Sequence, residues 1–253
     1  MNSKTGIVLS GGAIRGIAHL GVMKALAEAG VKFDLIAGTS IGAIIGAFIA
    51  HGYEPKEIFE FYKTTNPFKH LRPKLPGQGL LSAGKLFDEF KQHFQVDTFE
   101  GLDIPLFVTT TNLTLGEKAV FHEGPLFPVL KAASAVPLVF NPVEIEGQLH
   151  ADGGLMSNMP VEPLLGKCDY LIGINVNPIG EDHELSSMND ILLRTLHLSI
   201  WGNTNKNIEK LDVYIEPQEL KGISLIDQSK MQEIFDAGYH SGQKSIENIH
   251  ILE

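Results

Sequence analysis

The sequence predicts an α/β protein with a parallel central sheet, and three observations support this class. Short apolar runs alternate with helical patterns between Thr5 and Lys63. Two glycine-rich turns each join such a run to a helix. The chain has 253 residues, 43% of them hydrophobic, which is enough to bury a large core. We therefore expect one domain over residues 1–253.

The first elements carry the clearest pattern. Thr5–Leu9 is a short apolar run typical of a buried parallel strand, and residues 14–29 place apolar side chains at helical spacing. Phe33–Ala37 predicts a second strand. Ile41–Ala50 predicts a helix that is apolar on all sides and so lies beneath other layers. A third helix is expected over Pro55–Lys63. This order favours right-handed crossovers.

The rest of the chain alternates less regularly. Thr64–Gly79 contains several prolines and glycines and is predicted to be a loop, after which Ser82 is expected to cap a helix reaching Phe94. Further strands are expected at 104–111, 118–121, 143–145, 148–151, 170–176 and 212–215, and further helices at 127–135, 190–200 and 230–246.

The segment Gly38–Gly42 has the form G-x-S-x-G and lies directly between a predicted strand and a predicted helix. This is the context of a nucleophile elbow, in which flanking glycines allow a sharp turn that projects the serine hydroxyl from the sheet. The following helix directs free amide hydrogens to the same place. We interpret Ser40 as a nucleophile. The alternative is a tight turn with a helix-capping serine.

The segment Gly11–Gly16 (G-G-A-I-R-G) also joins a strand to a helix. It matches neither the dinucleotide fingerprint nor the P-loop. Its consecutive backbone amides suit a developing oxyanion. Alternatively, it is a turn that only lets strand and helix pack closely. Because both loops follow parallel strands, they are expected at the same carboxyl edge, where open α/β sheets bind ligands.

A serine nucleophile needs a group that accepts its proton. Asp152, followed by Gly153 and Gly154, comes directly after the predicted strand at 148–151. The glycines would allow close approach to another loop. A simple turn is the alternative explanation for Asp-Gly-Gly.

Together these segments resemble the signature blocks of the patatin-like phospholipases, and the resemblance extends to about Pro178. The matching blocks are Leu9–Gly16, Gly38–Gly42 and Asp152–Gly154 with Asn158–Pro160 after it, and Ala133-Ser134 with Pro137 resembles a further block of that family.

The resemblance implies a three-layer α/β/α sandwich with a mainly parallel sheet and a catalytic dyad without histidine. Ser40 would be the nucleophile and Asp152 the base. Many family members have a third glycine where this chain has Ala13, which keeps the amide but alters the loop. The implied oxyanion donors are the amides of Gly11, Gly12 and Ala13, and the implied supporting residues are Arg15, Gly38, Gly42, Gly153 and Gly154.

The implied activity is hydrolysis of ester bonds in phospholipids or related acyl lipids through an acyl-enzyme, without cofactor or metal. An acyltransferase or thioesterase could use the same dyad, and a non-catalytic lipid-binding regulator is a third alternative. An α/β-hydrolase triad is the remaining rival, although its elbow normally follows more strands. Its histidine would be His183, His197, His240 or His250.

Charge and cysteine content restrict partners and location. The formal net charge of -10 disfavours nucleic acid. The single cysteine, Cys168, cannot form an internal disulfide, and Met1–Leu9 is too short for a secretory signal, so we expect a cytoplasmic location. The longest apolar stretch, Leu35–Ala50, is too short and interrupted to span a bilayer. Membrane contact is therefore expected to be peripheral. The oligomeric state stays open.

A local basic patch interrupts this acidic chain. No acidic residue occurs between Phe61 and Phe87, where several leucines are interleaved with basic residues. We hypothesise that this loop is a flap meeting anionic lipid headgroups, and a solvated surface loop is the alternative. Its basic residues are Lys63, Lys69, Arg72, Lys74 and Lys85.

Overall fold

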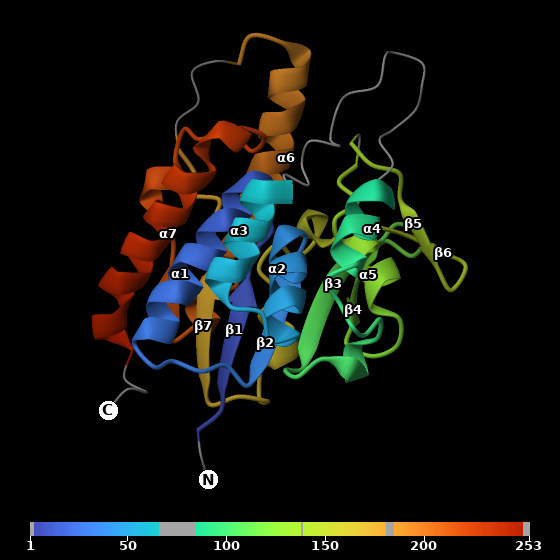
Figure 1. The fold of residues 1–253 in the computed structure, drawn as a ribbon. Coiled ribbons are helices and arrows are strands. Elements are labelled where there is room, and N and C mark those ends of the chain that lie inside the picture. Colours follow the sequence, from blue (N-terminus) through green and yellow to red (C-terminus); the bar gives the residue numbers. More distant parts are fainter. Residues whose placement is uncertain (1–2, 66–83, 138, 181–184, 250–253) are drawn as a thin grey trace.

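The computed structural model describes residues 3–65, 84–137, 139–180 and 185–249 (Figure 1). The helices are α1 (Ile17–Glu28), α2 (Ile41–Ala50), α3 (Pro55–Thr65), α4 (Gly84–Lys91), α5 (Leu126–Ala133), α6 (Met188–Asn205) and α7 (Met231–Ser245). The strands are β1 (Thr5–Leu9), β2 (Leu35–Thr39), β3 (Leu106–Asn112), β4 (Glu117–Phe121), β5 (Val143–Ile145), β6 (Gln148–Asp152), β7 (Tyr170–Ile174) and β8 (Val213–Ile215).

The strands form one mixed sheet, which confirms the predicted α/β class. Its order is β5-β6-β3-β2-β1-β7-β8, with β4 also paired to β3. The stretch from β3 through β2, β1 and β7 to β8 is parallel. The flank made by β4, β5 and β6 is antiparallel. The carboxyl ends of the parallel strands therefore form one edge, at the top of Figure 1.

Two strands meet end to end along β3. β4 occupies one side of β3. On the other side, β2 pairs with the first half of β3 as far as Thr39 opposite Thr109. β6 runs in the opposite direction and pairs with the second half, ending with Asp152 opposite Thr110. The carboxyl ends of β2 and β6 therefore converge at the middle of β3.

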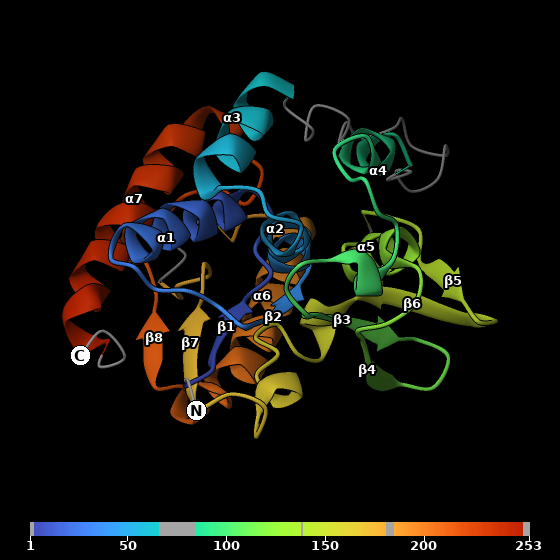
Figure 2. The same cartoon turned by 60° about the horizontal axis from the view of Figure 1, so that its bottom comes forward.

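Helices cover the two faces of the sheet unequally. α1, α2, α3, α5 and α7 lie over one face, where Ile7 and Ile36 join the main hydrophobic core (Figure 2). On the other face, Val8 and Leu35 pack against a second, smaller cluster that includes Met159 and Leu164. The three layers implied by the resemblance are therefore present, with a thinner cover on the second face.

The C-terminal helix packs closely on the first. A Cβ atom on Gly21 of α1 would lie 2.1 Å from the carbonyl oxygen of Phe235, and one on Gly238 of α7 would lie 2.1 Å from that of Ala18. These glycines let the two backbones approach more closely than side chains would permit. The segment after Pro178, which carries no recognisable motif, thus completes the helical layer over β1.

Most predicted elements are confirmed, with shifted boundaries. β1, α2 and β5 have the predicted limits, whereas β2 starts two residues later than predicted and continues to Thr39 because its ladder with β3 extends that far. α6 is longer than predicted at both ends. Ser82, Lys69, Arg72 and Lys74 lie outside the described residues. Among the described helices, none combines the length and apolar character needed to cross a membrane.

Candidate active site

Ser40 occupies the turn between β2 and α2 in a conformation that few side chains adopt. Its backbone angles are φ 55° and ψ -127°, in a strained region typical of nucleophile elbows. A Cβ atom on Gly42 would lie 2.4 Å from the carbonyl oxygen of Leu9, and one on Gly38 would lie 2.7 Å from the backbone of Gly42. Both glycines are therefore required by the close approach of backbone segments. Only 9% of Ser40 is exposed.

Asp152 faces Ser40 because β2 and β6 end at adjacent positions of β3. The Ser40 hydroxyl lies near enough to the Asp152 carboxylate to favour its ionised form. The backbone N–H of Gly154 donates a hydrogen bond to the same carboxylate, 2.7 Å long. A Cβ atom on Gly153 would lie 2.3 Å from the carbonyl oxygen of Thr109. The Asp-Gly-Gly sequence thus brings the carboxylate to the serine across a contact too tight for a side chain.

The environment of Asp152 makes it a better base than an ordinary aspartate. Burial raises the pKa of its carboxyl group to about 6, and the interactions with Ser40 and Gly154 only partly oppose this rise. At neutral pH the group is still mainly ionised. A carboxylate with a higher pKa accepts a proton more readily, so the arrangement favours general-base chemistry.

The glycine-rich loop lies directly against the elbow. A Cβ atom on Gly11 would lie 3.0 Å from the Cβ atom of Ser40. The amide of Gly11 donates to the carbonyl oxygen of Asn158 at 3.2 Å, so this predicted oxyanion donor is already engaged. Among the described residues, the amides of Gly12 and Ala13 have no acceptor. Of the three predicted donor amides, those of Gly12 and Ala13 are therefore free to bind another acceptor, and their role stays a prediction.

Ala13 shares the backbone strain of the elbow. Its φ of 48° places it in the left-handed region, where glycine is favoured. The other non-glycine residues with positive φ in the described chain are Ser40 and Glu146. Two of the three therefore lie at the candidate site. The alanine keeps the loop conformation at a conformational cost that glycine would not have.

Two side chains hold the peptide groups that precede the free amides. His19 Nε2 lies 2.8 Å from the carbonyl oxygen of Ser10, and because a carbonyl only accepts, Nε2 carries the proton. The amide nitrogen of the Asn177 side chain donates to the carbonyl oxygen of Gly11. The hydroxyl of Ser10 accepts from the N–H of Val176 at 3.1 Å. These contacts fix the orientation of the loop from two directions.

Arg15 connects the loop to the C-terminal part of the chain. Its Nε donates to the carbonyl oxygen of Ile223 at 2.7 Å, and the side chain is buried. The neighbouring N–H of Ile14 donates to the carbonyl oxygen of Leu225. Arg15 thus joins the glycine-rich loop to the C-terminal segment, and its positioning role stays a prediction.

An asparagine cluster after β6 links the Asp152 loop to α6. Asn203 Nδ2 donates to the carbonyl oxygen of Gly154 at 2.9 Å, and its Oδ1 accepts from the N–H of Asn158 at 2.8 Å. Asn207 Nδ2 donates to the carbonyl oxygen of Met159. Sequence analysis assigned no role to Asn203 or Asn207, and His19 was also missed. No local sequence pattern marks these residues, because each side chain bonds to a backbone carbonyl group in another segment of the chain.

The described residues do not support a histidine triad. Asp152 accepts a hydrogen bond from Gly154 and lies near the Ser40 hydroxyl, and no described histidine bonds to either Ser40 or Asp152. His150, two residues earlier on β6, instead faces the Thr110 hydroxyl at 2.9 Å. His183 and His250 lie outside the described residues. Within the described part of the chain, no three His, Cys, Asp or Glu residues are grouped so that they could hold a metal ion.

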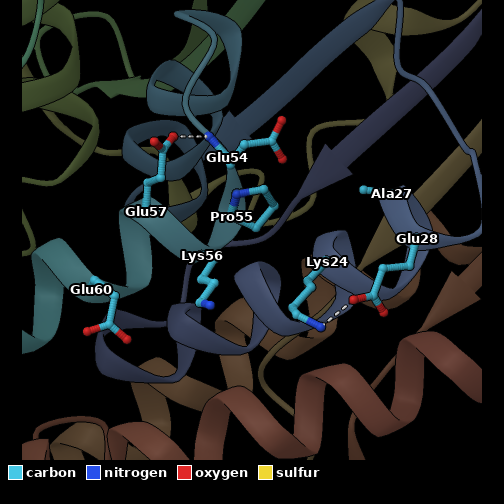
Figure 3. Close-up of a pocket in the computed structure, with 8 residues that line it drawn as sticks. All are labelled: Lys24, Ala27, Glu28, Glu54, Pro55, Lys56, Glu57 and Glu60. Carbon is cyan, nitrogen blue, oxygen red and sulfur yellow. Dashed lines mark hydrogen bonds and ion pairs between the residues drawn. The ribbon is translucent and has the colours of Figure 1, made fainter.

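A surface pocket elsewhere is unrelated to this site. It lies between the end of α1 and the start of α3 and is lined mainly by charged side chains, including the ion pair Lys24–Glu28 (Figure 3). α1 and α2 both run back from the carboxyl edge, so the pocket lies towards the opposite edge of the sheet from Ser40.

The chain is similar in sequence to known proteins. The model of the family described as patatin-like phospholipase matches residues 7–165. An uncharacterized NTE family protein of Mycobacterium bovis is 34% identical over 178 residues, which cover 69% of this chain and 49% of the relative. The lysophospholipase NTE1 of Meyerozyma guilliermondii is 25% identical over 271 residues, 94% of this chain and 19% of that protein. This chain therefore spans half or less of these relatives' length.

Solved structures show the same fold. VipD from Legionella pneumophila superposes with a TM-score of 0.58 at 16% identity, covering 98% of this chain and 67% of that one. The type III effector protein ExoU superposes with a TM-score of 0.50 at 14% identity, covering 97% of this chain and 53% of that one. With the family match over most of the chain, these findings lead to one conclusion: this chain belongs to the patatin-like phospholipase family.

Proposed function

We propose that this protein is a serine acyl hydrolase that cleaves ester bonds of phospholipids, lysophospholipids or related acyl lipids. One observation carries the proposal: the Ser40 hydroxyl lies next to the buried Asp152 carboxylate, and the adjoining glycine-rich loop has two backbone amides without an acceptor among the described residues. A nucleophile, a base and an oxyanion site are the parts that acyl transfer requires. Membership of the family and the name of the yeast relative support a lipid ester as substrate.

The proposed reaction has two steps. Asp152 accepts the proton of Ser40 as the hydroxyl oxygen attacks the ester carbonyl carbon, and the carbonyl oxygen becomes an oxyanion. The intermediate collapses to an acyl-enzyme, and the alcohol leaves with a proton from Asp152. Water then attacks the acyl group with Asp152 again as base, which releases the fatty acid and restores Ser40.

Stabilisation of the oxyanion compensates for the weakness of the base. Even with its raised pKa, Asp152 is a much weaker base than the alkoxide it generates. The amides of Gly12 and Ala13 would each contribute a hydrogen bond that strengthens as charge develops on the oxygen. Removing one such donor typically costs about 2.7–4 kcal/mol of transition-state stabilisation. Their fixed orientation, held by His19 and Asn177, means that little reorganisation is needed during the reaction.

Two substitutions test the dyad. Ser40→Ala and Asp152→Asn should each reduce hydrolysis of a short p-nitrophenyl ester by at least about 10³-fold. Asp236→Asn, on the exposed face of α7, is the matched control and should retain full activity. A fluorophosphonate probe should add its mass to wild type and not to Ser40→Ala. Full activity in either dyad variant, with an unchanged circular dichroism spectrum, would refute the proposal.

A further inference from the structure

Exposed apolar side chains are concentrated at the edge of the sheet where Ser40 lies. The most exposed are Ile226 and Met188, which are 79% and 77% exposed. Other exposed hydrophobic side chains lie elsewhere, among them Val120 and Leu165. We call the group at the carboxyl edge the apolar rim, and its main members are Leu115, Met156, Met188, Ile191, Leu192 and Ile226.

Besides α6, the rim comes from three separate segments around the candidate site. Leu115 lies in the turn after β3, and the second half of β3 pairs with β6, the strand that ends at Asp152. Met156 follows the Asp152 loop directly. Ile226 follows Leu225, whose carbonyl oxygen holds the glycine-rich loop. Each segment is therefore tied to a part of the catalytic arrangement, and single exposed hydrophobic residues scattered at random would not show this pattern.

α6 contributes the largest share of the rim. The helix extends beyond the carboxyl edge of the sheet, at the top of Figure 1. Its C-terminal end is fixed to the Asp152 loop through Asn203, whereas Met188, Ile191 and Leu192 near its N-terminus are exposed. The sequence from Leu185 to Asn205 contains only two charged residues, one acidic and one basic. Exposed apolar surface of this kind marks sites of contact with membranes or with other proteins.

We propose that the apolar rim inserts into the surface of a neutral or zwitterionic lipid aggregate and so places the Ser40 site at the substrate. This inference rests on the proposed function, because a hydrolase of acyl lipids must take its substrate from such a surface. The charge of the chain and of α6 indicates which kind of lipid surface the rim would enter. The chain carries a net charge of -10 and α6 has no basic excess, so nothing in the rim favours an anionic surface.

Vesicle binding tests the rim separately from the chemistry. In a Ser40→Ala background, which leaves the lipid intact, the protein should co-sediment with phosphatidylcholine vesicles. Binding should persist in high salt because it does not depend on charge. Substituting Met188, Ile191 and Leu192 together by Gln should reduce the partition coefficient at least about tenfold. Ile226→Gln, on another segment, should also reduce it, and Val120→Gln with Leu165→Gln is the matched control.

A soluble substrate separates the two proposals. In the otherwise wild-type protein, the triple Gln variant should hydrolyse a short p-nitrophenyl ester at the normal rate while it loses activity on phosphatidylcholine vesicles. If the wild-type protein, with Ser40 intact, did not hydrolyse the soluble ester, the proposed function would be refuted. The vesicle-binding result would not be affected.

Three results would overturn the rim proposal. One is unchanged vesicle binding in both the triple variant and Ile226→Gln. The second is binding of wild type to anionic vesicles alone with loss in salt, which would assign membrane contact to the basic loop. The third is a dimer in light scattering that the triple variant breaks, without any vesicle binding, which would assign the rim to a second copy of the chain.

Discussion

The imidazole of His19 and the carbonyl oxygen of Ser10 lie 2.8 Å apart in the buried space beneath the glycine-rich loop. Burial lowers the pKa of His19 to about 4, so the ring is neutral at physiological pH and donates through Nε2. The ring touches neither Ser40 nor Asp152 through a hydrogen bond. Its contact instead fixes the peptide group that precedes the proposed oxyanion donors, so we expect His19 to act as a positioning residue.

Removing this donor should affect turnover more than binding. His19→Leu leaves the Ser10 carbonyl without its partner, and we expect kcat on a p-nitrophenyl ester to fall about tenfold or more with little change in KM. His19→Gln can place an amide N–H near the Nε2 position and should recover most of kcat. Equal kcat values for the Leu variant and wild type would contradict the positioning role.

The raised pKa of Asp152 predicts the pH dependence of activity. The base must be ionised to accept the proton of Ser40, and its pKa in the free enzyme is about 6. We therefore expect kcat/KM to rise with pH through an apparent pKa of about 6 and to level off above pH 7. Wild-type protein should be measured with a neutral soluble ester between pH 4.5 and 8. A profile already flat below pH 5 would exclude this assignment.

The same raised pKa predicts that Asp152 destabilises the fold at neutral pH. Between the ordinary aspartate pKa and about 6, the native state binds more protons than the unfolded state, so the stability contributed by this group is lost as pH rises through about 6. Asp152→Asn removes the buried charge. It should raise the free energy of unfolding at pH 8 by on the order of 1–3 kcal/mol, measured by urea denaturation.

The gain should disappear near pH 4, where the wild-type carboxyl group is neutral. An Asn variant that is less stable than wild type at pH 8 would show that the hydrogen bonds of the carboxylate outweigh its burial.

Ala13 should tolerate glycine although most alanines do not. Relief of the left-handed strain at φ 48° offsets the entropy that glycine loses on folding. We expect Ala13→Gly to change the free energy of unfolding by less than about 1 kcal/mol and to keep activity. Ala27→Gly, at an exposed position inside α1, should cost about 1 kcal/mol. Thermal unfolding of both variants makes the comparison, and similar losses in both would argue against strain at Ala13.

Gly42 and Gly202 are both helical glycines, but they should respond oppositely to alanine. A Cβ atom on Gly42 would lie 2.4 Å from a backbone oxygen, whereas one on Gly202 would have no heavy atom within 4 Å. Gly42→Ala should lower the free energy of unfolding by at least about 2–3 kcal/mol and reduce activity. Gly202→Ala should raise it by about 0.5–1 kcal/mol. Melting temperatures of the two variants would decide the question.

Local patterns in the sequence predicted the elements and the loops of the site. The apolar runs of β1 and α2 and the glycines around Ser40 report constraints that act within a few residues, and these predictions have the correct limits. The position of Asp152 was predicted to follow a strand, but it is the last residue of β6 because it pairs with Thr110 of β3. Pairing between strands far apart in the chain leaves no local pattern.

Long-range contacts account for most of what sequence analysis missed. Asn203 contacts Gly154 across 49 positions, and Asn177 contacts Gly11 across 166. A single asparagine or a buried histidine has no pattern that distinguishes such a role from a surface or core position. The engagement of the Gly11 amide by Asn158 also depended on tertiary structure, so the number of available oxyanion donors was not predictable.

The end-to-end meeting of β2 and β6 on β3 has a consequence for folding. β2 belongs to the parallel core, which forms through long crossovers, whereas β6 forms a local hairpin with β5. Ser40 and Asp152 thus arrive with separate structural units. The return of esterase activity during refolding would therefore report when the hairpin docks onto β3. It would not report when either unit forms on its own.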